Sequence, residues 1–149
     1  MSGHDDHTDA GQQRQGDGDR LVIAQQTVRD LWGIELPLAA EPGEPANIED
    51  LRRLAMEHAF TDSWPRPGLD ARTKSLMTIS MLVGLGCHRT LRMHVSGALM
   101  LGITREEIIE LFIHAAAYCG LPRTSEAVDQ VKSLLERPPD APVESRTSD

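Results

Sequence analysis

Helical periodicity is the feature that most restricts the fold of this chain. Between residues 20 and 136, apolar side chains recur every three or four positions, and no segment shows the period-two alternation that a half-buried strand requires. The pattern predicts an all-α fold of about six helices, packed in an orthogonal or bundle-like arrangement.

Capping and turn residues set the expected helix boundaries. Asn47, Asp70 and Thr104 are residue types that cap helices, and Glu107 can complete a capping box with Thr104. Prolines and glycines, including those of DSWPRPGL at 62–69, mark the breaks. The expected helices cover residues 20–32, 47–60, 70–85, 88–101, 104–119 and 122–136.

The same spacing predicts which side chains are buried. In the first helix Val28 and Trp32 belong to an apolar stripe, and the second helix is expected to bury Leu51 and Leu54. The helices at 70–85 and 105–119 are apolar over more than half of their circumference. A chain of 149 residues has little to cover both, so a homo-oligomer is expected to bury the excess.

Length and composition predict one domain with two tails. Two cores would each be too small in 149 residues. Residues 1–19 are rich in Gly, Asp, Gln and His, and 137–149 follow a Pro-Pro pair. Neither segment has apolar periodicity, so both are expected to be disordered. The helical domain is expected to be 20–136.

Charge and composition narrow the class of partner. The net charge of −8 argues against nucleic-acid binding, which needs a basic face. No run of 18 apolar residues is present, and the N-terminus lacks the apolar region of a secretory signal. A cytoplasmic protein without a membrane or nucleic-acid partner is expected. No metal is expected either, because spacings such as H-x-x-x-H do not occur.

Several short motifs in fixed order carry a resemblance to a known family. They are WPRPGLD at 64–70, RTKSL at 72–76, His94 with GA at 97–98, GIT at 102–104, EEI at 106–108 and AYCGLP at 117–122. In this order they resemble the carboxymuconolactone decarboxylase family over roughly residues 50–135. VRDLWG at 28–33 is similar to the family's N-terminal helix.

The resemblance implies a fold, an assembly and an activity. It implies the alkylhydroperoxidase D-like helical fold in a ring-like homo-oligomer, often a hexamer built as a trimer of dimers. The implied activity is that of a lyase that decarboxylates a carboxylated lactone from aromatic compound degradation, or a related organic acid with a conjugated carbonyl. No cofactor is implied, because the conjugated carbonyl is itself the electron sink.

A sister branch of the family is redox-active. Its members carry a Cys-x-x-Cys pair, a His four residues on, and a Glu about one helix earlier. The corresponding positions here are Cys87, Thr90, His94 and Ser75. The resolving thiol and the Glu are therefore missing, and Ser75 fits the decarboxylase branch.

His94 is the expected proton donor. Loss of CO2 leaves a dienolate carbon that must be protonated, and an imidazole that titrates near neutrality can hold that proton. Cys87 and Tyr118 are further catalytic candidates. Cys87 is expected close to a helix N-terminus, which favours a thiolate, and Tyr118 carries a hydroxyl that could reach a substrate carbonyl.

Substrate binding is expected to depend on cations. Arg66 lies between two prolines and two residues after Trp64, so a stiff carboxylate clamp is possible there, as is a surface Arg stacked on the indole. His114 stands where family members usually carry Gln and could mark an altered substrate. The expected substrate-binding residues are Trp64, Arg66, Arg72, Ser75, Thr90, Arg92 and His114.

Two other functions remain open on the sequence. One is a thiol-dependent, alkylhydroperoxidase-like oxidoreductase that uses Cys87. The other is a non-catalytic helical oligomer or small-molecule binder that has kept the fold without the chemistry. The fold alone does not choose among them.

Overall fold

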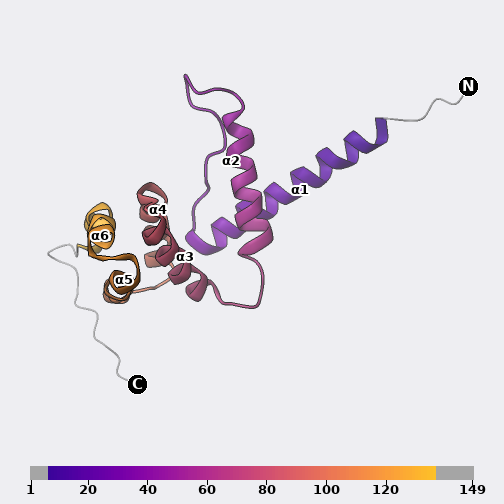
Figure 1. The fold of residues 1–149 in the computed structure, drawn as a ribbon. Helices are drawn as coiled ribbons and strands as arrows, with labels where there is room; N and C mark the ends of the chain where they lie inside the picture. The colour runs from indigo at the N-terminus through magenta and orange to yellow at the C-terminus, as the bar shows by residue number, and fades with distance from the viewer. Residues whose placement is uncertain (1–6, 137–149) are drawn as a thin grey trace, which may run out of the picture. The chain divides into compact units, whose positions relative to one another are not determined.

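The computed structural model describes residues 7–136, and the part of the chain that it describes consists of helices and connecting loops without a strand. The all-α prediction is confirmed. The elements, labelled in Figure 1, are α1 (His7–Trp32), α2 (Ile48–Glu57), the π-helix η1 (His58–Ser63), α3 (Ala71–Leu85), α4 (His88–Met100), α5 (Arg105–Cys119) and α6 (Leu121–Leu135).

The chain divides between Lys74 and Ser75, within the first turn of α3, into two compact units. Unit 1 comprises the residues up to Lys74, and unit 2 those from Ser75 on. The boundaries of the expected domain at 20–136 stay a prediction. Residues 1–6 and 137–149 of the expected tails lie outside the described part of the chain.

Helix α1 begins at His7, not at residue 20, so a helix replaces the expected tail over residues 7–19. The physical reason is that starting a helix is costly, whereas extending one adds a backbone hydrogen bond for each residue fixed. The packed turns that contain Val28 and Trp32 supply the start.

Unit 1 is built where α1 packs against α2 and η1 (Figure 1). Its core holds Val28, Trp32, Met56 and Phe60. The prediction that Leu51 and Leu54 are buried is wrong, because they are 62% and 66% exposed. In unit 1, α2 meets α1 along one narrow stripe, and the α2 residue buried there is Met56.

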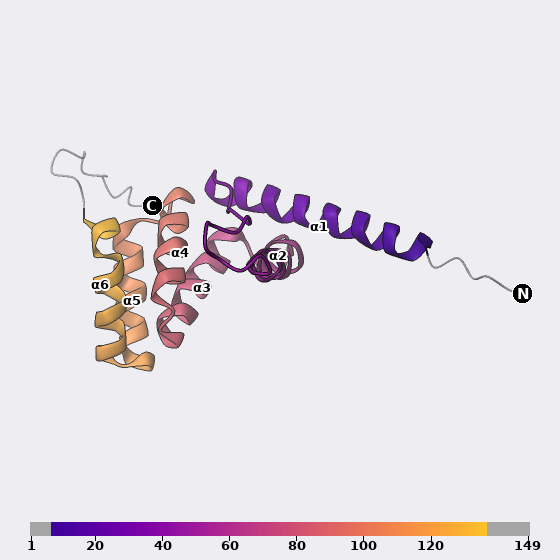
Figure 2. The ribbon, with the colours of Figure 1, turned by 90° about the horizontal axis from the view of Figure 1, so that it is seen from above.

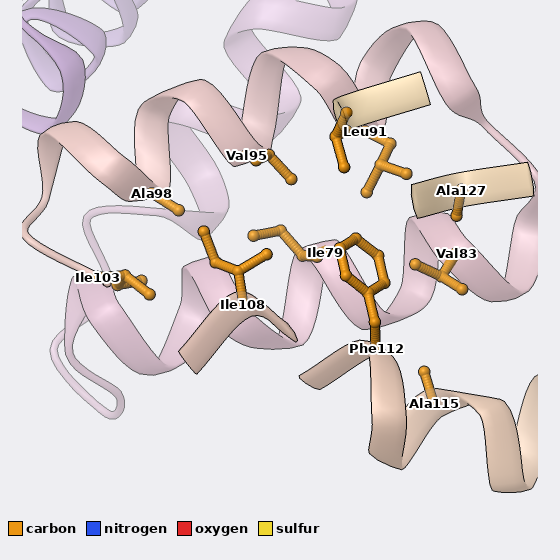
Figure 3. Close-up of a cluster of buried hydrophobic side chains, with 11 residues drawn as sticks. Ile79, Val83, Leu91, Val95, Ala98, Ile103, Ile108, Phe112, Ala115 and Ala127 are labelled. Atoms are coloured by element: carbon orange, nitrogen blue, oxygen red, sulfur yellow. The ribbon is translucent and has the colours of Figure 1, made fainter. Parts of the chain in front are cut away.

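Unit 2 is a bundle in which α6 packs against both α4 and α5. Figure 2 shows α6 beside α5. The close-up in Figure 3 shows side chains of α3 and α4 meeting in its core, with Val83 near Leu91 at one end and Ala98 at the other. The buried core residues of this unit are Ile79, Val83, Leu91, Val95, Ala98, Ile103, Ile108, Phe112, Ala115, Ala127 and Val131.

A glycine turn makes α3 and α4 antiparallel. Gly86 has φ +70°, and its N–H donates to Val83 O while the N–H of Cys87 donates to Leu82 O. This pair of bonds is a Schellman motif, which needs a left-handed residue at the position of Gly86. The motif closes α3 and starts α4 two residues later.

The predicted helix caps are confirmed at two of three positions. The Thr104 hydroxyl accepts from the N–H of Glu107, whose carboxylate accepts from the N–H of Thr104. The N–H of Thr73 donates to the Asp70 carboxylate at 2.6 Å. Asn47 makes no side-chain cap bond, so that part of the prediction is wrong. Among the described helices, none is long and apolar enough to cross a membrane.

Thr104→Ala should destabilise the protein by about 1 kcal/mol, because it leaves the N–H of Glu107 without its acceptor. Urea unfolding followed by circular dichroism would measure the loss. Thr104→Ser keeps the hydroxyl and is the control. Equal stability of the Ala and Ser variants would contradict a stabilising role for the capping box.

Candidate active site

His94 lies in the middle of α4, on the helix face that turns inward. Leu91, Val95 and Ala98 of the same helix are fully buried, and His94 itself is only 6% exposed. Residues three and four positions apart share a helix face, so burial of Leu91 and Ala98 takes the imidazole between them out of water. The structure therefore places this histidine in a shielded environment.

Burial lowers the pKa of His94 from 6.5 to about 4. The cause is desolvation, which disfavours the charged imidazolium. The expectation that His94 titrates near neutrality is wrong for the chain as described. At neutral pH the ring is neutral, so a proton that it donates must arrive together with a negative charge that stabilises the imidazolium.

Ser75 is a second buried polar side chain, four residues before Ile79 on the same face of α3. It is fully buried on α3, and its hydroxyl oxygen has no hydrogen-bond partner in the part of the chain described. Ser80, on the same helix, instead donates to Leu76 O at 3.0 Å. A buried hydroxyl without a partner costs about 1–3 kcal/mol, which makes Ser75 a candidate to receive a ligand.

The predicted thiol position is at the surface. Cys87 is exposed at the N-cap of α4 and makes no side-chain cap bond. Thr90 is exposed one turn before His94. Cys87 and Thr90 are thus accessible, whereas His94, on the same helix, is buried.

Arg92 is engaged in holding two helices together. Its guanidinium donates to Gln130 O at 3.1 Å and to the Ser133 hydroxyl at 3.0 Å, both on α6. These bonds satisfy acceptors near the C-terminal end of α6 and link it to α4. The predicted role of Arg92 as a substrate clamp stays a prediction, beside this structural one.

His114 and Tyr118 form a ring pair on the exposed side of α5. Their ring centroids are 5.0 Å apart and the rings are tilted by 51°. Tyr118 is 79% exposed, and His114 is exposed as well. The structure brings these two predicted site residues together, but it places them on the surface of unit 2, unlike the buried His94.

In unit 1, Trp64 belongs to a cluster of three aromatic rings. It stacks on Phe60, with ring centroids 6.1 Å apart and an interplanar angle of 17°. With Trp32 it forms a T-shaped pair, with centroids 6.1 Å apart and an interplanar angle of 75°. Trp32 and Phe60 are themselves in edge contact at 5.4 Å. The half-buried Trp64 therefore anchors the connector that follows it.

The connector from Trp64 to Asp70 is held by Lys74. The ammonium of Lys74 donates to Trp64 O at 2.8 Å and also to Arg66 O. Arg66 and Arg72 have exposed side chains. The N–H of Thr73 donates a hydrogen bond to the carboxylate of Asp70, and this bond lowers the pKa of the carboxyl group below its usual range.

Sequence reasoning did not single out Lys74, which looks like a surface cation. The signal that could have found it is the proline content of WPRPGL, because Pro65 and Pro67 have no N–H to donate. Carbonyls in such a segment need donors from elsewhere. Among residues 7–136, no three His, Cys, Asp or Glu side chains form a group that could hold a metal ion.

The described part of the chain is thus an all-α protein with a buried imidazole on α4. A family model described as "Carboxymuconolactone decarboxylase family" matches residues 49–133, more than half of the chain. The chain therefore belongs to the carboxymuconolactone decarboxylase family, as the motifs indicate.

Two relatives have names that state an activity. The chain is 34% identical over 88 residues to 4-carboxymuconolactone decarboxylase of Acinetobacter baylyi, covering 59% of this chain and 66% of the relative. It is 40% identical over 77 residues to nitrosuccinic acid decarboxylase npaB of Metarhizium robertsii, covering 52% and 54%.

A third relative is an uncharacterized 15.0 kDa protein of Paracoccus denitrificans, 35% identical over 81 residues, with 53% of this chain and 60% of the relative covered. The chain thus spans between about half and two thirds of the length of these relatives.

The lowered pKa of His94 predicts acid destabilisation. The unfolded chain binds a proton at His94 below about pH 6.5, and the folded chain binds it only below about pH 4. The contribution of His94 to the free energy of unfolding is therefore fully present above pH 6.5. It falls as the pH drops towards 4, by on the order of 3 kcal/mol. Urea unfolding at pH 7.5 and pH 4.5 would measure the difference. His94→Gln should flatten this dependence, and an equally steep dependence in that variant would assign it to other groups.

Proposed function

We propose that the protein is a cofactor-free decarboxylase, a lyase that acts on a carboxylated lactone or a related acid with an electron-withdrawing group next to the carboxylate. The observation that carries the proposal is the buried His94 in a chain that belongs to this family. The proposal does not extend to a particular substrate.

The names of the two relatives suggest what the substrates share. One relative is named for a carboxylated muconolactone and the other for nitrosuccinic acid. A conjugated carbonyl and a nitro group both accept the electron pair that remains when the C–C bond to CO2 breaks. The proposed substrate is therefore an acid with two or more carboxylates, of which one leaves from a carbon joined to such an electron sink.

The proposed role of His94 is to protonate the carbanionic carbon. Because the ring is neutral in the free chain, we propose that it takes up its proton when the anionic substrate binds. A carboxylate close to the imidazole favours the charged form and raises its pKa again. After CO2 leaves, the imidazolium gives the proton to carbon and returns to the neutral form that the apolar surroundings favour.

The proposal gives Ser75 the role of a hydrogen-bond donor. Its buried hydroxyl can donate to a substrate oxygen, which removes the cost of leaving it without a partner. The predicted binding of a carboxylate by Arg66, which belongs to unit 1, stays a prediction. The predicted contributions of Trp64, Arg72, Thr90, Arg92 and His114 to substrate binding, and of Tyr118 to catalysis, stay predictions.

His94→Gln should abolish CO2 release from acids of this class, because the amide cannot donate a proton as an imidazolium does. Cys87→Ser should keep the wild-type rate, since Cys87 is exposed on α4 and takes no part in the proposed reaction. A coupled CO2 assay on 4-carboxymuconolactone and nitrosuccinate would test both variants.

The outcomes separate the competing functions. An undiminished rate in His94→Gln removes this residue from the mechanism. Peroxide turnover that is lost in Cys87→Ser would instead favour the thiol-dependent oxidoreductase. If wild type releases no CO2 from any acid of the class and turns over no peroxide, the helical binder is what remains.

We also propose that the protein acts as a homo-oligomer, with a hexamer built as a trimer of dimers as the form implied by the family resemblance. Apolar side chains supporting this lie exposed on both apolar helices of unit 2. They are Met77, Met81 and Leu85 on α3, and Ile109 and Ile113 on α5. A cytoplasmic location, consistent with two free cysteines, and a role in aromatic compound degradation belong to the same proposal.

Ile113→Asp should shift the protein towards smaller species, because it would place a charge in a buried contact of the assembly. Light scattering after size exclusion would measure the mass. Ser125→Asp, at an exposed position on α6, adds the same charge and is the control. An unchanged mass in the Ile113 variant would show that this part of α5 is outside any interface.

A further inference from the structure

We propose that Lys74 is a positioning residue, whose ammonium holds the connector so that Arg66 presents its guanidinium to a carboxylate. This inference deepens the proposed function and rests on it for the identity of the ligand. The observation behind it is the pair of bonds from Lys74 to Trp64 O and Arg66 O.

The connector needs such a donor. The N–H groups of Trp64 and Arg66 are already used, by Ala59 O at 2.9 Å and Ser63 O at 3.2 Å. Pro65 and Pro67 have none to offer to neighbouring carbonyls. One ammonium therefore satisfies the carbonyls on both sides of Pro65, and a charged donor makes a stronger bond to them than a neutral one.

Both ends of the connector are fixed as well. At the start, the Trp64 indole stacks on Phe60. At the end, Asp70 caps α3 through its carboxylate, and its carbonyl accepts from the N–H of Lys74 at 3.1 Å. Asp70, the last residue of the connector, therefore caps the helix that carries Lys74, and the Lys74 side chain binds back to the connector. The closed arrangement restricts the backbone of Arg66.

Arg66 differs from four other arginines of unit 1. Arg20, Arg29, Arg52 and Arg53 each pair with a carboxylate of Asp62, Glu57, Glu35 or Glu44. The exposed side chain of Arg66 has no such partner among the described residues. A cation on a restricted backbone, without a carboxylate of its own chain, loses less backbone entropy when it binds an external carboxylate than a cation on a flexible loop.

The test uses succinate, an unreactive dicarboxylate, as the probe. Isothermal titration would give its dissociation constant, and the Nε–H resonance of Arg66 would report contact. In the wild type we expect the resonance to shift on addition of succinate. In Lys74→Met the dissociation constant should rise about tenfold, because the backbone that carries the Arg66 side chain is no longer held in place. Lys74→Arg, which keeps charged donors, should recover part of the affinity.

A double-mutant cycle separates positioning from a general structural role. In the Arg66→Gln background, Lys74→Met should change the dissociation constant less than about twofold, because a residue that acts through Arg66 has nothing left to position. Thermal unfolding of each variant would check that it is folded. Lys132→Met removes the chain's other lysine, an exposed residue on α6, and should leave binding unchanged.

Several results would overturn the inference. These are a wild type whose Arg66 resonance does not respond to succinate, a Lys74→Met variant with wild-type affinity, and a tenfold loss that persists in the Arg66→Gln background. On an acid that is turned over, Lys74→Met should raise KM and leave kcat nearly unchanged. If succinate binds through Arg66 but no acid releases CO2, the decarboxylase proposal fails and the positioning role stands.

Discussion

Burial of one face of α4 determines the chemical state of its histidine. Leu91, Val95 and Ala98 must be removed from water for unit 2 to have a core, and His94 lies on the same side of the helix. The cost falls on the charged form of the ring, whose pKa drops to about 4. An anion beside this shielded ring would favour its charged form and raise its pKa again, which is the basis of the role proposed for His94.

The Schellman turn at Gly86 makes this burial possible. It reverses the chain within a few residues, so that α3 and α4 share one core (Figure 3). A residue other than glycine would adopt φ +70° only with strain. The same turn leaves Cys87 at the surface, at the start of α4. The turn therefore leaves the imidazole of His94 buried and the thiol of Cys87 exposed on the same helix.

In unit 1 the connector from Trp64 to Asp70 contains two prolines, which have no N–H to donate. Aromatic stacking at Trp64 and the ammonium of Lys74 replace the missing backbone bonds. The exposed Arg66 lies in the middle of this restricted segment, and the role proposed for Lys74 depends on that position. In an enzyme for anionic acids, a restricted guanidinium binds substrate at a lower cost in entropy than a flexible one.

The sequence by itself determined the all-α class, most helix boundaries and the caps at Asp70 and Thr104, because these depend on local spacing and on side chains next to the backbone they cap. Its motifs also determined the family. Only the tertiary structure decided that Leu51 and Leu54 stay exposed, that Arg92 binds α6, and that His94 is neutral. These properties depend on which surfaces meet after folding, and periodicity along the chain does not encode the partner of each face.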